Sequence, residues 1–309
     1  MKIYTLTLNP AYDIHAFAEN FAPYHENLAT VQSREAGGKG VNISRALNAS
    51  GVPNTAVIVL GRENCGDFKQ ALQEASMDCI LFEKEGRIRE NLTLHCANTP
   101  ETRISFAGFS VDDGILTQIQ QVITVDKDTI VTYTGRTPKG MTKEMVTSFL
   151  KTLRQQGAKI VLDSKSFSLE DIYEIQPWLI KPNQEEISEY FSCDVKTISQ
   201  AQEKAREFAR HGIANAMISL GEQGALLIAD GEAYVAKPPV ISAVSTIGAG
   251  DSSIAGFLAA AHQGKSAAEC LKMAVSFGTA ACLTAGTLPP KPEDVRRIFD
   301  GVEMHISAE

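Results

Sequence analysis

Thr129-Ile130-Val131-Thr132-Tyr133 and Lys159-Ile160-Val161-Leu162-Asp163 are two short apolar segments of the 309-residue chain. A helix-like segment at 142–155 separates them. Short apolar runs that alternate with helices form βαβ units, in which the two strands lie parallel in one sheet. This stretch therefore predicts an α/β fold with a mostly parallel sheet.

The same alternation continues toward the C-terminus. Three more strands are expected at 178–181, 216–220 and 225–229. One more helix is expected at about 199–211, between the first two of these strands. Polar or glycine residues follow several of these strands, and open α/β sheets bind ligands at the carboxyl ends of their strands. We therefore expect four such residues to meet in one crevice: Gly135, Asp163, Asn183 and Gly221.

The first hundred residues are less regular. Residues 14–34 and 88–107 have the alternating polarity of short strands, most clearly at 91–96 and 102–106. They predict a separate small sheet that forms a lid on the crevice. The alternative is that these strands merely extend the main sheet.

A glycine turn and an acid stand where an apolar helix begins, in Thr246-Ile247-Gly248-Ala249-Gly250-Asp251-Ser252-Ser253. Small residues let the chain fold tightly, so the free amides of the first helical turn can point at an anion, aided by the helix dipole. A carboxylate at Asp251 could take a proton from a substrate hydroxyl. The segment indicates a phosphoryl-transfer centre, although an ordinary helix start with a capping or first-turn acid has the same composition.

A second glycine turn leads into an amphipathic helix at residues 36–48. Its glycines permit close approach of the backbone to a ligand. Lys39 and Asn42 offer a cation and an amide to a polyhydroxylated molecule. The chain has no Gly-x-x-x-x-Gly-Lys-Ser/Thr spacing, so this is not a Walker loop. The alternative is a plain turn with a solvated lysine.

The two glycine turns, with two motifs between them, resemble the signatures of the PfkB (ribokinase-like) carbohydrate kinases over nearly the whole chain. In chain order the motifs are Gly37-Gly38-Lys39-Gly40-x-Asn42, Lys181-Pro182-Asn183-x-x-Glu186, Ser219-Leu220-Gly221-x-x-Gly224-Ala225 and Gly248-Ala249-Gly250-Asp251. Together with the first motif, Thr7-Leu8-Asn9-Pro10-Ala11-x-Asp13 is similar to the branch that phosphorylates sugar phosphates. That branch holds 1-phosphofructokinase, tagatose-6-phosphate kinase and the minor 6-phosphofructokinase.

The resemblance implies a three-layer α/β/α sandwich in which residues 1–309 form one kinase domain. Its β lid would be formed by segments at about 12–35 and 86–108. The cofactors would be ATP and Mg²⁺. The resemblance also implies a homodimer in which the lids clasp each other, through apolar residues that could as easily cover the chain's own sheet. These residues are Phe17, Phe21, Leu92 and Leu94.

The resemblance further implies a role for each motif residue. Asp251 would be the base for the attacking sugar hydroxyl. The amides around Ala249, Gly250 and Asp251, which follow Gly248, would form an anion hole for the moving phosphoryl group. Asn183 and Glu186 would hold Mg²⁺, mostly through water, although Glu186 could instead belong to a solvated helix face. The other implied contacts are Lys181, Ser219, Gly221 and Gly224 with the nucleotide, and Asp13, Gly38 and Asn42 with sugar hydroxyls.

The acceptor's own phosphate needs fixed positive charge, because burying a doubly charged group without partners is costly. Lys39 and Arg89 are the candidates. Arg89 lies in Gly86-Arg87-Ile88-Arg89-Glu90-Asn91, which resembles the branch's Gly-x-Thr-Arg-x-Asn on a lid strand. An exposed strand arginine could equally be a surface cation.

Three residues depart from the branch pattern. Leu28 follows Asn27 where the branch has Asn-Arg, so one expected arginine is missing, and Ile88 replaces a threonine. Arg136 replaces the serine of the branch's Gly-Ser-Leu-Pro. Our hypothesis is that Arg136 supplies the positive charge that is missing at Leu28. The alternative is that these changes signal a different acceptor.

Composition limits the classes of partner. A formal charge of −8 and a pI near 5.4 argue against a nucleic-acid surface, which would need clustered Lys and Arg. The N-terminus lacks the apolar run of a signal peptide, and no apolar run is long enough to span a membrane. Six cysteines show no Cys-x-x-Cys pair or metal-ligand spacing, so we expect reduced, mostly buried thiols in a cytoplasmic protein.

The expected function is ATP-dependent phosphorylation of a phosphorylated ketohexose, with fructose 1-phosphate converted to fructose 1,6-bisphosphate as the leading case. Tagatose-6-phosphate kinase and 6-phosphofructokinase are close alternatives. A kinase for an unphosphorylated sugar or nucleoside is a further one, which the pair Lys39 and Arg89 argues against. A silent sugar-phosphate sensor is disfavoured, since it would have no chemical need for Asp251 or for the residues from Asn183 to Glu186.

Overall fold

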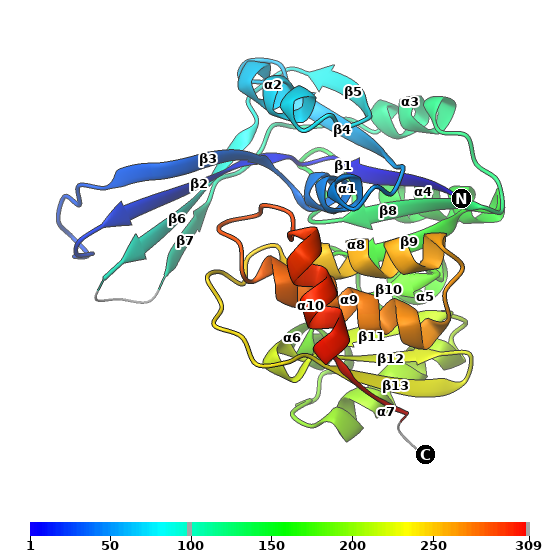
Figure 1. Cartoon of the computed structure of the whole chain (residues 1–309). Coiled ribbons are helices and arrows are strands. Elements are labelled where there is room, and N and C mark those ends of the chain that lie inside the picture. Colours follow the sequence, from blue (N-terminus) through cyan, green and yellow to red (C-terminus); the bar gives the residue numbers. More distant parts are fainter. Residues whose placement is uncertain (98–100, 307–309) are drawn as a thin grey trace.

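Two β-sheets organise the chain in the computed structural model, which describes residues 1–97 and 101–306 (Figure 1). The large sheet has this strand order within the described residues: β14 (Glu303–Ile306), β13 (Glu232–Lys237), β12 (Ala225–Ala229), β11 (Asn215–Ser219), β10 (Leu179–Ile180), β9 (Lys159–Asp163), β8 (Thr129–Thr134), β1 (Lys2–Thr7), β4 (Thr55–Gly61) and β5 (Cys79–Lys84). The strands expected from about residue 128 onward are therefore present, within one or two residues of their expected bounds.

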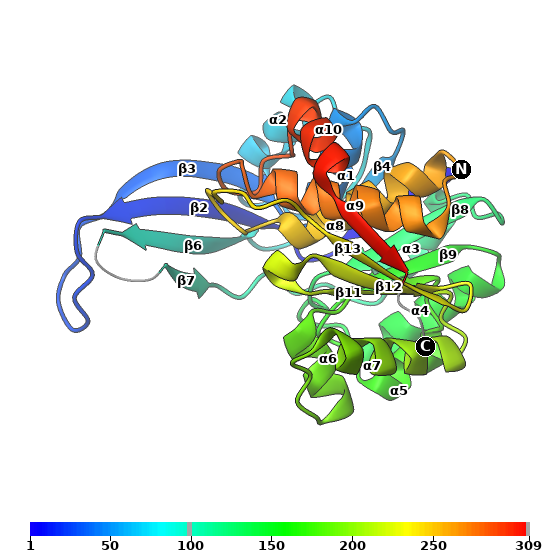
Figure 2. The ribbon, with the colours of Figure 1, turned by 60° about the horizontal axis from the view of Figure 1, so that its bottom comes forward.

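Helices cover both faces of the large sheet, which gives the three layers expected from the sequence (Figures 1 and 2). One face carries α1 (Lys39–Ala49), α8 (Ala249–His262), α9 (Ala267–Ala281) and α10 (Pro292–Gly301). The other carries α2 (Gly66–Glu74), α3 (Gly114–Val122), α4 (Lys143–Gln155), α5 (Leu169–Ile175), α6 (Gln184–Phe191) and α7 (Ile198–Arg210). Each face buries its own apolar core, because the strands are buried on both sides.

The large sheet is parallel from β5 to β11 and antiparallel from β11 to β14. A 3-10 turn at Gly221–Gln223 joins β11 to β12 as a hairpin, so this pair cannot be a parallel βαβ unit. The parallel strands bring their carboxyl ends to one edge. There the amide of Gly135 donates to the carbonyl of Asp163, and Asn183 forms a parallel bridge with Ser219.

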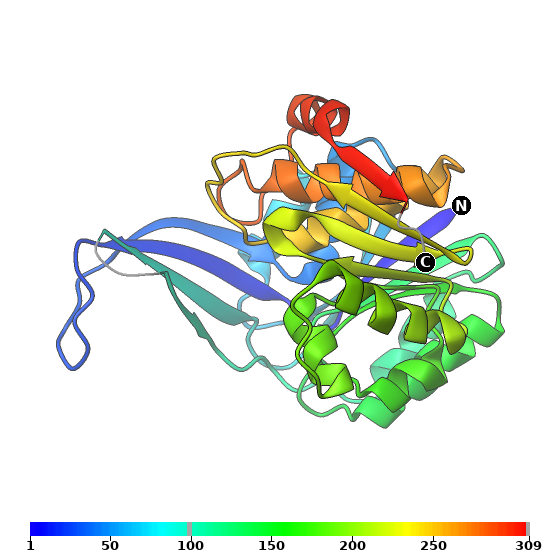
Figure 3. The same cartoon turned by 90° about the horizontal axis from the view of Figure 1, so that it is seen from below.

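The small sheet is separate from the large one, so the alternative of a merely extended main sheet is wrong. Its strand order is β3 (Thr30–Gly37), β2 (Ala11–Ala18), β6 (Arg89–Cys96) and β7 (Thr102–Ser105). It projects from one side of the body in every view (Figures 1 to 3). Residues 98–100, within the expected second lid segment, lie outside the described residues.

The two faces of the small sheet differ in polarity because side chains alternate along a strand. Pairing aligns Asp13 with Asn91 and Ser105 on one face. The other face carries Ala16 and Leu94, which form a small apolar cluster with Ala18. The polar face therefore holds several of the side chains that the sequence singled out.

No described helix is long and apolar enough to cross a membrane. The six cysteines are all free, as the sequence predicted. Two of them, Cys65 and Cys270, are buried and the other four are partly exposed, so the expectation of mostly buried thiols is wrong. Partial exposure arises because strand and helix ends, such as those at Cys96 and Cys282, carry several of them.

Candidate active site

Asp251 lies in the first turn of α8 and is only 6% exposed. The helix begins after Gly248, whose φ of 78° lies in the left-handed region that favours glycine. The side-chain amide of Asn42, on α1, donates to Oδ2 of Asp251 at 2.9 Å. The two glycine turns at opposite ends of the sequence therefore place Asn42 and Asp251 in direct contact.

Close helix packing fixes the position of α8. A Cβ at Gly256 would lie 2.5 Å from the carbonyl oxygen of Met273 on α9, and one at Gly278 would collide with the Ser253 hydroxyl. Only glycine allows the two helices to approach this closely. Asp251 is thus carried on a rigid element, which suits a residue that must hold one orientation.

A chain of alternating charges lies beside Asp251. The ammonium of Lys39 is 2.9 Å from Oδ2 of Asp163, and that of Lys181 is 3.8 Å from the same oxygen. Although burial acts to raise it, Lys181 and Lys39 hold the pKa of Asp163 below its usual value. Although burial acts to lower it, Asp163 and then Asp251 raise the pKa of Lys39. Lys39 therefore stays cationic, and both ammonium groups lie close to the buried carboxylate of Asp163.

The start of α8 leaves backbone donors for an anion. The amide of Ser252 donates to the carbonyl of Gly248, and the amide of Ala249 donates to the carbonyl of Thr246. Among the described residues, no acceptor is found for the amides of Gly250 and Asp251. A Cβ at Gly250 would lie 3.2 Å from the ammonium of Lys181. Two free amides, a helix N-terminus and an ammonium group therefore converge, which is the arrangement that binds phosphoryl groups.

Burial raises the pKa of Asp251 to about 6, against the opposing effects of Lys39 and of the hydrogen bond from Asn42. A carboxyl group with this pKa is ionised at neutral pH and is a stronger base than an exposed aspartate.

We expect kcat/KM to fall as pH falls through about 6, and about tenfold per pH unit below it, because only the ionised form of Asp251 accepts a proton. A pH–rate profile from 5 to 8 checks this. Phosphate monoesters also ionise near pH 6, so the profile is repeated with Asn42→Leu. Loss of the amide hydrogen bond should move the inflection to higher pH, whereas an inflection that stays in place belongs to the acceptor.

A second polar group gathers on the small sheet around Asp13. Asn91 donates to Oδ1 of Asp13 at 2.8 Å, and Arg89 donates to Oδ1 of Asn91 at 3.2 Å. Asp13 is 6% exposed, and a Cβ at Gly37 would collide with its carboxylate. Gly38, with a φ of 122°, follows at the start of α1, which brings the Asp13 group next to the turn that carries Lys39 and Asn42.

Arg89 and Arg103 lie near this carboxylate, and the charge of Arg136 acts on Arg89. Arg103 on β7 lies 3.6 Å from Oδ1 of Asp13. Burial lowers the pKa of the Arg89 guanidinium, Asp13 opposes this, and the nearby charges of Arg103 and Arg136 lower it further. The Nε of Arg89 is buried without a partner. The structure thus brings Arg89 and Arg136 near each other and adds Arg103, which the sequence reasoning missed.

The other two departures from the branch pattern lie away from this cluster of arginines. Leu28 is 92% exposed in the loop between β2 and β3. Ile88 is 2% exposed and packs in the apolar core, so its side chain fills a core position. Lys39 pairs with Asp163 and stands near Asp251, which separates it from the charges that act on Arg89.

Asn183 and Glu186 form a reciprocal capping box at the start of α6. Oδ1 of Asn183 accepts from the amide of Glu186, and Oε2 of Glu186 accepts from the amide of Asn183. Glu186 is 8% exposed, so it does not belong to a solvated helix face. Its Oε1 remains available, 3.7 Å from Lys165.

This donor set fits a hydrated Mg²⁺. Glu186 lines a small polar cavity together with Asp163, Lys181 and Tyr190. Among residues 1–97 and 101–306, no group of three or more His, Cys, Asp or Glu side chains is arranged to hold a metal ion. One free carboxylate oxygen in a polar cavity suits a hard ion that keeps most of its water ligands.

The residues expected to contact the nucleotide stand at the β11–β12 turn. Ser219 ends β11 next to Asn183, and Gly221 has a φ of 61° with open space where a Cβ would point. Gly224 has a φ of 92°, and a Cβ there would collide with the carbonyl of Ala236. The tight hairpin alone therefore explains Gly224, and contact with a nucleotide stays a prediction for it.

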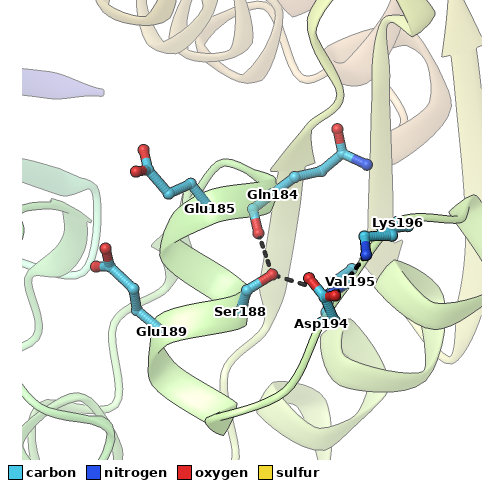
Figure 4. A pocket seen from close by; sticks show the side chains of 7 residues that line it. All are labelled: Gln184, Glu185, Ser188, Glu189, Asp194, Val195 and Lys196. Carbon is cyan, nitrogen blue, oxygen red and sulfur yellow. Dashed lines mark hydrogen bonds and ion pairs between the residues drawn. The ribbon is translucent and has the colours of Figure 1, made fainter.

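A surface hollow is lined by residues of α6 and of the loop that follows this helix (Figure 4). Its lining is Gln184, Glu185, Ser188, Glu189, Asp194, Val195 and Lys196. Ser188 is saturated there, since it donates to the Gln184 carbonyl and accepts from the Val195 amide. The hollow contains none of the residues that the sequence singled out for chemistry.

Comparison with known proteins agrees with this geometry. The model of the pfkB family carbohydrate kinases matches residues 7–294. The chain is 30% identical to 1-phosphofructokinase of Escherichia coli (strain K12), over 91% of this chain and 90% of that protein. It is 27% identical to ATP-dependent 6-phosphofructokinase isozyme 2 of the same strain, over 97% and 98% of the two chains.

A solved structure of phosphofructokinase-2 from Escherichia coli, in complex with substrates and products, has a similar fold. It superposes with a TM-score of 0.91 and 26% identity, over 97% of this chain and 99% of that one. The chain is a sugar kinase, a phosphotransferase with an alcohol acceptor, and it belongs to the pfkB family of carbohydrate kinases.

Proposed function

We propose that this kinase transfers the γ-phosphoryl group of ATP to a phosphorylated ketohexose, with fructose 1-phosphate as the leading acceptor. The observation that carries the proposal is that Arg89 and Arg103 lie beside Asp13 and that the charge of Arg136 acts on Arg89. Such an excess of positive charge calls for an anion on the acceptor. Relatives named 1-phosphofructokinase and 6-phosphofructokinase support the same class of acceptor.

Asp251 acts as the general base. It takes the proton from the attacking sugar hydroxyl as the sugar oxygen bonds to the γ-phosphorus and the bond to the β–γ bridging oxygen breaks, so that ADP leaves. The amides of Gly250 and Asp251 and the ammonium of Lys181 stabilise charge on the moving group. Asp13 and Asn42 orient the sugar hydroxyls.

Glu186 would hold Mg²⁺ through water, and the metal would neutralise charge on the ATP phosphates. Asn183 fixes Glu186 through the capping box and, with Ser219 and Gly221, lines the path of the nucleotide phosphates. Six free thiols and a need for MgATP fit a cytoplasmic enzyme.

The small sheet serves as a lid that excludes water from the γ-phosphate. It also supports a homodimer, although Phe21, Leu92 and Leu94 pack within its own apolar cluster. Val31 and Ile104 are 60% and 44% exposed on that same face and would form the contact between two lids. Sedimentation at micromolar concentration should show a dimer that Val31→Asp weakens, and a clean wild-type monomer would exclude the clasp.

Arg136→Ser should raise the KM for the phosphosugar several-fold and weaken its salt dependence, because one exposed cation near Arg89 is lost. Steady-state kinetics at two ionic strengths measures both. Unchanged values would mean that Arg136 does not replace the arginine missing at Leu28.

The test of the proposed function is ADP release with MgATP across fructose 1-phosphate, fructose 6-phosphate, tagatose 6-phosphate and the corresponding free sugars. Strong preference for one phosphosugar supports the proposal and names the acceptor. Turnover of free sugars alone would contradict it.

A further inference from the structure

Glu35, near the end of β3, joins the small sheet to the loop between α9 and α10. The hydroxyl of Thr287 in that loop donates to Oε2 of Glu35 at 3.1 Å. A Cβ at Gly286 would lie 3.0 Å from Oε1 of Glu35 and 3.1 Å from Nε2 of His15. Glu35 pairs with Asp13, and His15 lies two residues further along β2, so both side chains belong to the polar face of the small sheet. The loop therefore meets the sheet on the face that carries Asp13.

Arg45 on α1 provides positive charge beside Glu35. Its guanidinium donates to the carbonyl of Ala36 at 2.6 Å, which ties the end of β3 to α1. Burial lowers the pKa of Arg45, and the charges of Glu35 and then of Asp13 oppose this. Like charges that are directly opposite each other on neighbouring strands repel, so Arg45 offsets the repulsion between these two carboxylates. Glu35 is thus tied to the same helix that carries Asn42.

Thr287 also packs against the turn that begins α8. It is 6% exposed, and a Cβ at Gly248 would lie 3.5 to 3.7 Å from its three nearest atoms, all of which belong to Thr287. The amides of Gly250 and Asp251 in the proposed anion hole follow this turn directly. Thr287 therefore stands between the small sheet, which its hydroxyl contacts, and the turn that aims these amides.

Resting on the proposed function, we propose that Glu35 is a positioning residue that acts through Thr287. Asp13, the strand partner of Glu35, orients the acceptor, and the turn at Gly248 places the donors for the moving phosphoryl group. The hydrogen bond between Glu35 and Thr287 fixes the distance between these two parts of the site. Transfer requires the sugar hydroxyl and the γ-phosphorus to be close and aligned, whereas binding of either substrate alone does not. The hydrogen bond therefore serves turnover more than affinity.

The test compares wild type with Thr287→Val, Thr287→Ser and Glu35→Gln on the best acceptor. Thr287→Val removes the hydroxyl at nearly constant shape and should lower kcat about tenfold, with the KM values for ATP and acceptor within about twofold. Thr287→Ser keeps the hydroxyl and should retain most of the turnover. Glu35→Gln keeps an acceptor oxygen without the charge, so kcat should fall less than in Thr287→Val. The double variant Glu35→Gln, Thr287→Val should be no slower than Thr287→Val alone, because both changes act on one hydrogen bond.

ATP hydrolysis in the absence of acceptor separates positioning from packing. Water needs no placement by the small sheet, so Thr287→Val should leave the hydrolysis rate unchanged and raise the ratio of hydrolysis to transfer about tenfold. Glu63→Gln is the control, because Glu63 is an exposed glutamate in the turn between β4 and α2.

Equal loss of hydrolysis and transfer in Thr287→Val would mean that Thr287 only packs against Gly248, and it would overturn the proposal. So would an unchanged kcat in Thr287→Val, or losses that multiply in the double variant. Wild type that turns over free sugars alone would instead overturn the proposed function. The same comparison on that free sugar would still test Glu35, so the two failures are distinguishable.

Discussion

Asp251→Asn is expected to lower kcat by about 100-fold or more, in the range for loss of a general base. The amide cannot take the proton of the sugar hydroxyl at any pH, so the inflection near pH 6 should also disappear. The KM values for both substrates should change little, because Asn has nearly the same shape and can still accept the hydrogen bond from Asn42. Steady-state ADP release across pH 5 to 8 measures all three quantities.

The midpoint of thermal unfolding separates a lost catalytic base in Asp251→Asn from misfolding of this variant. Burial disfavours the charged form of Asp251, so a neutral Asn should leave the midpoint of thermal unfolding equal or higher. Asp300→Asn makes the same chemical change at an exposed position on α10 and should leave kcat unaltered. Near-normal turnover in a folded Asp251→Asn protein would show that another group, or the substrate itself, accepts the proton.

Local sequence predicted the parts of the site that a single segment builds. The start of α8 at Gly248 and the start of α1 at Gly38 could be predicted because a glycine turn before an apolar helix is a short-range signal. The strands at 129–134 and 159–163 could be predicted from their apolar runs. Each of these depends on residues that are neighbours in the chain.

The pair Asn183 and Glu186 has the spacing of a capping box as well as that of the metal motif. An Asn three residues before a Glu at a helix start has the spacing of a capping box. The structure shows that the same two residues cap α6 and leave Oε1 of Glu186 outside the cap, 3.7 Å from the ammonium of Lys165. One short motif can therefore carry a structural and a chemical role together.

Pairs that meet across the fold could not be predicted. The order of β1, β8 and β9 brings Lys39 close to Asp163. The register of β2, β6 and β7 brings Arg103 close to Asp13. A shift of one residue in the register of β7 would turn Arg103 to the other face of the small sheet. Sequence alone does not set such a register, so it predicts neither the ion pair of Lys39 with Asp163 nor the contact of Arg103 with Asp13.

Arg89→Gln is expected to raise the KM for the phosphosugar roughly 30-fold or more, the usual scale for truncating one member of a partly buried charge pair. Arg89 should matter more than Arg103 because Asn91 already orients its guanidinium and its Nε is buried. That preorganisation lowers the entropic cost of holding the phosphate. Turnover at saturation should stay within a few-fold, since this contact is made equally in the ground state and the transition state.

The measurement is kcat and KM for phosphosugar and free sugar at two salt concentrations. Arg87→Gln is the matched control, because Arg87 is an exposed arginine two residues earlier on the same segment. If Arg89→Gln lowered kcat as strongly as it raised KM, the guanidinium would act on the transition state, and the phosphate that it binds would be the one being transferred. An effect confined to the KM of the phosphosugar, and lost at high salt, would instead show that Arg89 binds the phosphate that the acceptor already carries. Arg89 would then hold the acceptor in place while Asp251 and the anion hole at the start of α8 act on its reacting hydroxyl.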